Sequence, residues 1–398
     1  MTSPLPQVKL KIARRSSHPW IFQKMVEKPA ERIPPGTIVD IIDRDNVWAG
    51  RGFFNWHSRI ALRVLTAKQD EAVDADFFTR RIQRAIELRR DLLHLDRETD
   101  AYRLIHSEGD GLSGLIVDRF GSTIVLEFFS AGMYRQRQVL QDILQSSFSA
   151  RSQASESEPP RFYWFAEEHI QKQESFDCRS PEPPPPGVIT EHGLRFRVAP
   201  GSKHKTGFFS DQRDNRKLLA SFCEGKRVLD LCCNTGGFSV YAKALGKAED
   251  VVGVDLDEQA IALAKQNANL NQAKIRFVQG DLFTWLRDTL PSGQRFDVVV
   301  LDPAKQTRDR DEVDFALKRY FDMNKLALQA VAPGGIFLTC SCTGLVSEDM
   351  FLETLRRSAW QAGRSLQVLQ IAGAGPDHPV HIHAPEGRYL KAVFCRVE

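Results

Sequence analysis

The C-terminal half of the chain, residues 188–398, alternates apolar strand-like runs with stretches of helical character. Strands rich in Val, Ile and Leu without polar interruption are typical of a parallel sheet that is buried on both faces. Strands that alternate with helices predict an α/β domain with helices covering both sides of that sheet. The expected strands are Arg227 to Cys232, Asp250 to Leu256, Ile275 to Gln279, Phe296 to Leu301 and Ile336 to Cys342.

Helix signals fit between these strands. Asp257 and Ser347 are good N-cap residues, and they precede the expected helices Glu258 to Leu270 and Glu348 to Trp360. Pro333-Gly334-Gly335 is expected to stop a helix before the last strand of the set. The alternating stretch Tyr389 to Val397 predicts a terminal edge strand.

Two further segments precede this domain. Residues 1–75 predict a small β-rich module, with the strand-like runs Gly36 to Ile42, Val47 to Phe54 and Ile60 to Leu65 between turns. Residues 76–185 begin with an amphipathic helix, Asp76 to Leu93, and continue with the strands Leu115 to Asp118 and Ile124 to Phe129. The Ser-, Glu- and Pro-rich stretch 149–160 is expected to be mobile, and the Pro-rich stretch 180–187 is expected to link this segment to residues 188–398.

The overall composition narrows the class of protein only broadly. A formal net charge of +3 over 398 residues is too small to indicate a nucleic-acid partner by itself. The seven cysteines lack zinc-ligand spacing, so we expect no metal and a reduced, cytoplasmic protein. The start of the chain lacks the apolar core of a signal peptide, and no apolar run is long enough to span a membrane.

Aspartates mark the ends of four successive predicted strands of the α/β domain. Ligands of such sheets bind beyond the carboxyl ends of the strands. Any single aspartate there is better explained as an ordinary strand terminus or helix cap, but four in a row favour a site. We expect one of the carboxylates to accept hydrogen bonds from ribose hydroxyls and another to accept one from an adenine amino group. Together they would supply a negative field for a sulfonium. The set is Asp230, Asp255, Asp281 and Asp302.

The turn after the first of these strands departs from the dinucleotide-binding pattern. Cys232 and Asn234 occupy two of the positions where glycine would let a pyrophosphate approach the backbone. This disfavours a nicotinamide oxidoreductase and favours a nucleoside ligand without phosphate. We assign Cys232, Asn234, Thr235 and Gly236 to the binding of that ligand.

The chain resembles the bacterial 23S rRNA large subunit (cytosine-C5) methyltransferase I family. Matching motifs occur in family order and span nearly the full length. They are Ser17-His-Pro-Trp-Ile-Phe22, Glu108-Gly-Asp-Gly-Leu-Ser-Gly-Leu115, Lys205-Thr-Gly-Phe-Phe-Ser-Asp-Gln-Arg213, Asp230-Leu-Cys-Cys-Asn-Thr-Gly-Gly-Phe238, Ser341-Cys-Thr-Gly-Leu345, Asp377-His-Pro379 and Pro385-Glu-Gly-Arg-Tyr-Leu-Lys391.

The resemblance implies a fold, a cofactor and a substrate. The expected fold is an N-terminal PUA RNA-binding module at 1–75, a small central α+β domain at 76–185, and a Rossmann-like class I methyltransferase domain at 188–398 with a mostly parallel seven-stranded sheet. The expected cofactor is S-adenosyl-L-methionine, and the expected partner is ribosomal RNA with an unpaired or flipped cytosine; a homodimer is a family-level expectation. Lys205 to Arg213 would lie beside the cofactor, with Phe208 or Phe209 packed on it and with Gln212 and Arg213 in the site.

The chemistry of cytosine methylation requires a nucleophile at the edge of the cofactor pocket. Carbon 5 becomes reactive once a thiolate has added to carbon 6. Strand alternation places Cys340 and Cys342 on one side, with Cys342 nearer the strand end, and the family pattern assigns the nucleophile to Cys342. Cys340 is expected to pack in the core. The sequence does not indicate what would lower the pKa of the Cys342 thiol.

Further candidates follow from the loop after the fourth strand and from the basic N-terminus. Asp302 is expected to position the cytosine or to assist proton transfer. Lys305 stands where methyltransferases of exocyclic amines carry an aromatic residue, and Ala304 departs from the Asp-Pro-Pro-Lys of the family. The RNA-binding candidates, all but one from the acid-free stretch 1–24, are Lys11, Arg14, Arg15, His18, Trp20 and Lys305. The alternatives are an RNA methyltransferase for another base atom and a non-catalytic RNA-binding or ribosome-assembly protein.

Overall fold

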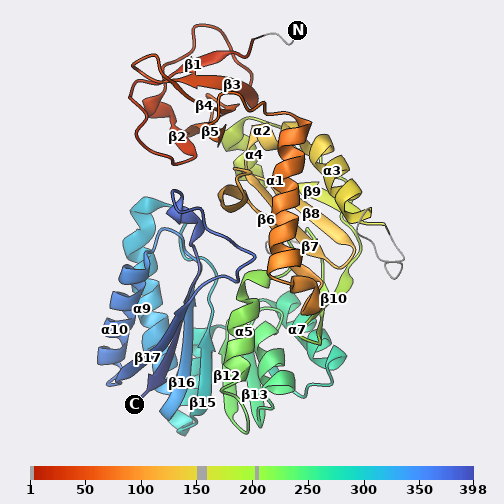
Figure 1. The fold of residues 1–398 in the computed structure, drawn as a ribbon. Coiled ribbons are helices and arrows are strands. Elements are labelled where there is room, and N and C mark those ends of the chain that lie inside the picture. The colour runs from red at the N-terminus through yellow and green to blue at the C-terminus, as the bar shows by residue number, and fades with distance from the viewer. Residues whose placement is uncertain (1–3, 150–158, 202–205) are drawn as a thin grey trace. The chain divides into compact units, whose positions relative to one another are not determined.

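The computed structural model describes residues 4–149, 159–201 and 206–398, which form two compact units (Figure 1). The first unit contains Met1–Ile189, Val198–Phe208 and Pro376–Gly387, and the second contains Thr190–Arg197, Phe209–Gly375 and Arg388–Glu398. Most of the stretch expected to be mobile, residues 150–158, and Lys205 lie outside the described residues. The expected three-domain division stays a prediction, and the structure adds that Pro376–Gly387 belongs to the first unit.

The N-terminal part of the first unit is a five-stranded sheet with the order β1-β3-β4-β5-β2. β1 runs parallel to β3, and the other neighbours are antiparallel. Apolar side chains such as Val39, Ile41 and Leu62 form its core. The bounds are Gln7–Lys9 for β1, Trp20–Phe22 for β2, Thr37–Ile42 for β3, Trp48–Phe54 for β4 and Ile60–Thr66 for β5. The last three correspond to the predicted strand-like runs, whereas β1 and β2 were not predicted.

The rest of the first unit packs helices on a four-stranded sheet, β6-β7-β8-β9. Asp74 caps α1 by accepting the backbone N–H of Phe77, and α1 buries its apolar stripe while continuing as a wide π turn over Leu88–Leu92. The bounds are Ala101–His106 for β6, Leu115–Phe120 for β7, Thr123–Phe128 for β8, Arg161–Phe165 for β9, Ala75–Glu87 for α1, Ala131–Arg135 for α2, Arg137–Ser149 for α3 and Glu168–Glu174 for α4.

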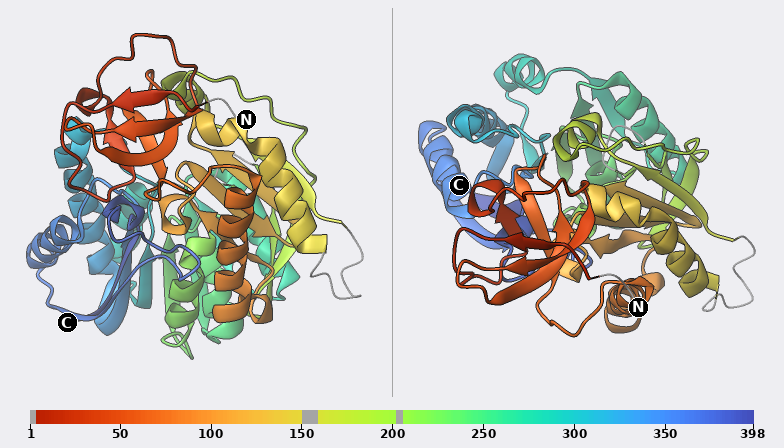
Figure 2. Two further views of the ribbon diagram at one scale, coloured as in Figure 1. Left: turned by 45° about the horizontal axis from the view of Figure 1, so that its top comes forward. Right: turned by 90° about the horizontal axis from the view of Figure 1, so that it is seen from above.

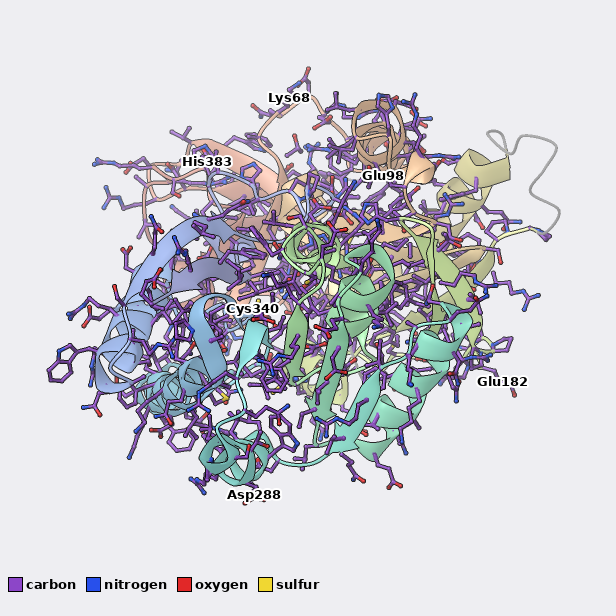
Figure 3. All side chains as sticks on the ribbon, turned by 90° about the horizontal axis from the view of Figure 1, so that it is seen from below. Lys68, Glu98, Glu182, Asp288, Cys340 and His383 are labelled. Atoms are coloured by element: carbon purple, nitrogen blue, oxygen red, sulfur yellow. The ribbon has the colours of Figure 1, made fainter. Side chains whose placement is uncertain are left out.

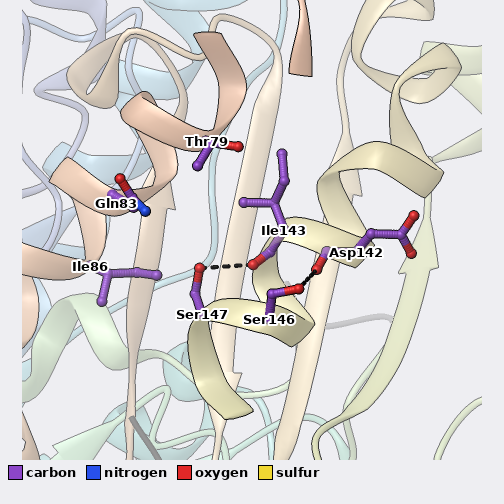
Figure 4. A pocket seen from close by; sticks show the side chains of 7 residues that line it. All are labelled: Thr79, Gln83, Ile86, Asp142, Ile143, Ser146 and Ser147. Carbon is purple, nitrogen blue, oxygen red and sulfur yellow. Dashed lines mark hydrogen bonds between the residues drawn. The ribbon is translucent and has the colours of Figure 1, made fainter. Parts of the chain in front are cut away.

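A hollow between α1 and α3 is lined by seven residues, among them Thr79, Ser146 and Ser147 (Figure 4). Each of these three hydroxyls donates a hydrogen bond of 2.8 Å to the carbonyl four residues earlier in its own helix. These three hydroxyls are therefore used within their own helices, and we assign the hollow no chemistry.

The second unit is a seven-stranded sheet with the order β14-β13-β12-β15-β16-β18-β17, preceded by the hairpin of β10 and β11. β14 to β16 are parallel neighbours and β18 is antiparallel to both β16 and β17. The strand bounds are Gly187–Glu191 for β10, Leu194–Val198 for β11, Arg227–Leu231 for β12, Asp250–Asp255 for β13, Arg276–Gln279 for β14, Phe296–Leu301 for β15, Val331–Ser341 for β16, Leu366–Ala372 for β17 and Lys391–Val397 for β18.

Helices cover both faces of this sheet, as the ribbon views show (Figure 2). Alternate residues of the central strands enter different apolar clusters: Val298 and Val300 of β15 face one cluster, and Val299 faces the other. This period of two explains the nearly continuous apolar sequence of the strands. The helix bounds are Arg213–Ala220 for α5, Gly237–Val240 for α6, Glu258–Leu270 for α7, Leu282–Thr289 for α8, Val313–Ala330 for α9 and Glu348–Gln361 for α10.

The predicted fold class is confirmed, with two local corrections. Tyr389 to Val397 is not an edge strand, because β18 pairs on both sides and leaves the edge to β17. Pro333-Gly334-Gly335 does not end the helix, because α9 already ends at Ala330 and the three residues lie within β16. There they occupy an irregular stretch of the pairing with β15. Within the described residues, no helix is long and apolar enough to cross a membrane.

Candidate active site

The turn after β12 is unusually tight. Cys232, Asn234 and Gly236 have φ angles of 60°, 47° and 80°, which are left-handed and disfavoured for the first two residues. The turn is closed by a hydrogen bond of 2.8 Å from the Gly236 N–H to the Cys233 carbonyl, and α6 begins directly after it. A side chain at Gly236 would lie 3.0 Å from the ring of Phe277. Strain of this kind persists only where surrounding contacts hold the backbone.

Asp255, the last residue of β13, helps to hold this turn. Its Oδ2 accepts the backbone N–H of Asn234 at 2.8 Å, and its Oδ1 accepts that of Asp257 at 2.9 Å. Because each carboxylate oxygen has two lone pairs, both atoms can accept a further hydrogen bond from a ligand.

Asp230, near the end of β12, is completely buried. Its Oδ2 accepts the N–H and the hydroxyl of Ser239 at 3.0 and 2.6 Å, whereas its Oδ1 has no hydrogen-bond partner among the described residues. Burial, together with the charges of Asp302 and Asp255, raises the pKa of Asp230 to about 7. A buried carboxylate without a full set of partners is a group that a bound cation would stabilise.

The other two aspartates lie just beyond their strands. Asp281 is exposed and caps α8, since its Oδ1 accepts the N–H groups of Phe283 and Thr284 at 3.0 and 3.1 Å. Asp302 directly follows β15, and its Oδ2 accepts a hydrogen bond of 3.0 Å from Nε2 of Gln212. Each of the four aspartates thus has a structural role beside any role in binding.

The four carboxylates act together on one thiol. Burial raises the pKa of Cys232 far above its ordinary value, and the charges of Asp255, Asp302, Asp230 and Asp281 raise it further, in that order of effect. The turn that carries Cys232 therefore lies in a negative field from four strands. Such a field fits a cationic, phosphate-free nucleoside such as the sulfonium S-adenosylmethionine.

The segment that enters α5 supplies further groups to the second unit. Gln212 and Arg213 are buried, and the Oε1 of Gln212 accepts a hydrogen bond of 2.6 Å from Asn215. Arg213 Nε lies 3.2 Å from Asp214 Oδ1. Phe209 is half-buried, and its carbonyl accepts Arg216 Nη1 at 3.0 Å. Phe208 is buried in the first unit.

The two candidate cysteines differ in their surroundings. Cys340 is completely buried in an apolar cluster with Leu338 and Phe394, and burial raises the pKa of its thiol well above its ordinary value. It lies among the strands of the sheet in Figure 3, whereas the labelled Asp288 of α8 points outward. Cys342 is half-buried in the segment just after β16. The surroundings of Cys340 are those of a packing residue, as expected.

Cys342 and Asp302 lie on neighbouring strand ends. β15 and β16 are parallel, with Leu301 opposite Thr339, so Asp302 and Cys342 follow at the same edge of the sheet. Both residues affect the phenol of Tyr320. Burial raises the pKa of Tyr320 to about 12, with smaller increases from the charges of Cys342 and Asp302.

The loop after β15 is tied to the loop that carries Cys342 through Thr343. Its Oγ1 accepts the N–H of Gln306 at 3.1 Å and shares a hydrogen bond of 2.8 Å with the hydroxyl of Tyr320. Tyr320 was not found by sequence reasoning, because it belongs to no recognisable chemical motif. Thr343 lies in one of the matching motifs but was given no role. Lys391 was also missed as a site residue, although it closes one of the matching motifs.

The RNA-binding candidates have different environments. Lys11, Arg15 and Lys305 are exposed. In contrast, the Arg14 guanidinium donates to the carbonyls of Ala49 and, at 3.1 Å, Ser16.

His18 and Trp20 are partly buried and bonded within the first unit. Nε2 of His18 lies 3.2 Å from Oε2 of Glu386, and Nε1 of Trp20 donates to Glu108 at 2.7 Å. Arg63 also lies over the Trp20 ring, at 5.9 Å from its centroid. These contacts stabilise the fold and leave Lys11 and Arg15 as the more accessible cations of the N-terminal set.

Comparisons with known proteins identify the family of this chain. A family model for S-adenosylmethionine-dependent methyltransferases matches residues 103–391, and a PUA-like domain model matches residues 11–67. A crystal structure described as a methyltransferase complexed with SAH has the same fold, with a TM-score of 0.80 at 19% identity over 98% of this chain and 99% of that one. The chain therefore belongs to the S-adenosylmethionine-dependent methyltransferases, and its cofactor is S-adenosylmethionine.

Curated relatives narrow the family. Ribosomal RNA large subunit methyltransferase I of Aeromonas hydrophila is 39% identical over 388 residues, which is 95% of each chain. The protein of the same name from Tolumonas auensis is 38% identical with the same coverage. The chain belongs to the ribosomal RNA large subunit methyltransferase I family, and the expected resemblance is confirmed.

Proposed function

We propose that this protein transfers the methyl group of S-adenosylmethionine to carbon 5 of a cytosine in 23S ribosomal RNA, with Cys342 as nucleophile. The half-buried Cys342 follows β16 at the same carboxyl edge of the sheet at which Asp302 follows β15, and this position is the observation that carries the proposal. The relatives that match 95% of the chain are named as ribosomal RNA large subunit methyltransferase I.

The cofactor would bind across the carboxyl ends of β12 to β15. Asp255 would accept the ribose hydroxyls and Asp281 the adenine amino group, while Asp230 and Asp302 would stabilise the positive sulfonium. The turn residues Cys232, Asn234, Thr235 and Gly236 would line the ligand, as would Phe208, Phe209, Gln212 and Arg213. Bound there, S-adenosylmethionine supplies an electrophilic methyl group.

The protein's own groups would carry the remaining chemistry. The Cys342 thiolate forms a bond to carbon 6 of cytosine, and the electron pair of the 5,6 double bond makes carbon 5 nucleophilic. After carbon 5 has taken the methyl group, a base removes the carbon 5 proton. The electron pair of that C–H bond restores the double bond, and Cys342 leaves as thiolate. Asp302 is our candidate to orient the cytosine or to receive this proton.

The loop after β15 favours this reaction over methylation of an exocyclic amine. It carries Lys305, which is exposed, where amine methyltransferases place an aromatic residue to stack the base. The target cytosine must be unpaired or flipped, because carbon 6 cannot reach a thiol from within a helix. The PUA-like domain with Lys11 and Arg15 would hold adjacent RNA through its phosphates. A homodimer and a cytoplasmic location stay predictions.

Transfer of a tritium-labelled methyl group to rRNA tests the proposal. The protein is incubated with tritiated-methyl S-adenosylmethionine and rRNA from a strain that lacks the enzyme, and the nucleosides are separated. We expect label in 5-methylcytosine that is lost in Cys342→Ala and retained in Cys340→Ala, the matched thiol near the end of β16. Label that survives Cys342→Ala would exclude this nucleophile, and label in another nucleoside would overturn the substrate. Failure to bind S-adenosylmethionine would favour a non-catalytic RNA-binding role, whereas binding without label would point to a missing ribosomal particle or a different acceptor.

A further inference from the structure

Lys391 is a buried lysine beside the proposed nucleophile. It is the first residue of β18 and pairs with Ser341 of β16, the residue before Cys342. Its side chain is only 3% exposed. Lysine is rarely buried to this extent unless its ammonium group is compensated, so its surroundings need a specific explanation.

The ammonium group is held by three backbone carbonyls. Nζ donates to Thr343 O at 2.8 Å, to Val346 O at 2.8 Å and to Tyr389 O at 2.9 Å. A protonated lysine has three N–H donors, so these bonds use its full capacity. Two of the three acceptors belong to the turn that directly follows Cys342, and this turn is also closed by the Val346 N–H, which donates to Thr343 O at 3.0 Å. Lys391 thus fixes the backbone on which Cys342 stands.

The charges around Lys391 come from several elements. Of the neighbouring groups that favour the charged form of Lys391, Cys342 has the largest effect, and Glu348 at the start of α10 has the next largest. Glu348 is already paired with Arg388 at 2.6 Å. Lys305, from the loop after β15, and Arg388 oppose the charge. Burial is the largest effect and lowers the pKa of Lys391 to about 8, so the group is mostly charged at pH 7.

We propose that Lys391 is a positioning residue that keeps Cys342 poised as a thiolate, by fixing the turn after it and by placing a buried positive charge beside it. This inference rests on the proposed role of Cys342 as nucleophile. A cation next to a thiol favours the thiolate, which is the reactive form. The desolvated position strengthens that interaction relative to one in water.

The rate of Cys342 alkylation across pH 5.5–10 tests the proposal without any RNA substrate. Iodoacetamide is used as probe, and the peptide that contains Cys342 is quantified by mass spectrometry. We expect the wild-type rate to rise with a midpoint below the value of about 8.5 for a free thiol. In Lys391→Met the midpoint should rise by at least about one unit, which slows alkylation at pH 7 about tenfold.

Lys243→Met is the matched control. Its ammonium group also donates to backbone carbonyls, those of Ala248 and Glu249 at 2.9 and 2.8 Å, but it lies in another part of the second unit. The alkylation profile of Cys342 should not change in this variant. A purely structural lysine would behave like Lys243, so an unchanged profile in folded Lys391→Met would overturn the inference.

The wild-type protein keeps the inference testable if Lys391→Met does not fold. A wild-type midpoint at or above 8.5 would contradict it directly. Failure of the proposed function is seen separately, as label in a nucleoside other than 5-methylcytosine or as activity that survives Cys342→Ala. A low alkylation midpoint would retain the lysine–thiolate pair in either case, while the first result rejects the substrate and the second rejects the nucleophile.

Discussion

Nε2 of Gln212 donates a hydrogen bond of 3.0 Å to Oδ2 of Asp302, across 90 positions of sequence. The bond brings the segment before α5 to the end of β15. Gln212 is itself held by Asn215, which donates to its Oε1 at 2.6 Å and to Gly373 O at 3.0 Å. Asp302 is therefore oriented by a chain of buried amides.

Gln212→Leu should impair catalysis through this chain. Loss of a hydrogen bond to a partly buried carboxylate costs about 1–3 kcal/mol, so we expect kcat for methyl transfer to fall between about fivefold and 150-fold. KM for RNA should change much less. Steady-state kinetics compare this variant with Gln259→Leu, an exposed glutamine on α7. Equal kcat values in the two variants would mean that Asp302 needs no such support.

The affinity for S-adenosylmethionine should increase with pH. Burial and nearby carboxylates raise the pKa of Asp230 to about 7 from an ordinary value of 3.8. A cationic ligand favours the ionised carboxylate, so binding should tighten as pH rises from about 6 to 8, by up to about tenfold. Isothermal titration calorimetry at several pH values measures this, with release of a proton on binding at pH 6.

The Asp230→Asn variant should abolish that pH dependence, and Asp288→Asn, an exposed residue of α8, should preserve it. The folding stability that Asp230 contributes should change with pH in the opposite direction to the cofactor affinity. Because the folded-state pKa lies above the unfolded one, the contribution of Asp230 to stability is fully present below about pH 4 and is lost as pH rises toward 7. Without ligand, Asp230→Asn should therefore gain stability relative to wild type as pH increases through this range.

Gly236→Ala, in the turn after β12, should lower the stability of the protein more than Gly225→Ala, in the turn before β12. Both glycines have positive φ, 80° and 67°, so the conformational penalty of about 1 kcal/mol is shared. Only at Gly236 would the new Cβ meet other atoms, 3.0 Å from Phe277 and 3.1 Å from Ala264. We expect thermal unfolding to show a larger loss of stability for Gly236→Ala and calorimetry to show weaker S-adenosylmethionine binding in that variant alone. Equal losses in both variants would exclude crowding as the cause.

Arg89→Met should destabilise the first unit. Arg89 is completely buried and forms a bidentate pair with Asp110 at 2.5 and 2.8 Å, and its Nη2 also donates to Asp377 O at 2.7 Å. Removal leaves a buried carboxylate unpaired, which costs about 3–5 kcal/mol. Arg90→Met, next in sequence but paired with the more exposed Asp96, should cost at most about 1 kcal/mol. Urea unfolding followed by circular dichroism distinguishes the two.

The exposed N-terminal cations should contribute to RNA affinity. Combined Lys11→Ala and Arg15→Ala should weaken binding of rRNA fragments and reduce the slope of log affinity against log salt by about 0.7 for each single-strand phosphate that the variant no longer neutralises. Arg14→Ala should instead lower stability, since its guanidinium donates to backbone carbonyls. The slope is tested by measuring RNA affinity at KCl concentrations that span about a sixfold range, from about 50 to 300 mM. An unchanged slope in the double variant would remove both residues from the RNA interface.

Local sequence patterns determined many of the strands and helix ends of this protein. The apolar runs predicted strands β12 to β15 within about one residue at each end, because strands buried on both faces are mostly apolar, whereas β16 begins at Val331 and not at Ile336. The predicted N-caps Asp257 and Ser347 are confirmed, since capping depends on only three or four neighbouring residues. The aspartates at strand ends were also visible, because parallel strands bring their carboxyl ends to one edge.

The tertiary structure alone decided the contacts between distant segments. Nothing in the sequence places Lys391 against the turn after Cys342, or β18 between β16 and β17. The motif of Asp377 had no physical assignment until its carboxylate was found to accept the Arg103 N–H at 3.0 Å, 274 positions away. Periodicity and capping report on a residue's neighbours along the chain, whereas these contacts depend on how whole strands and loops pack, and that information is spread over the entire sequence.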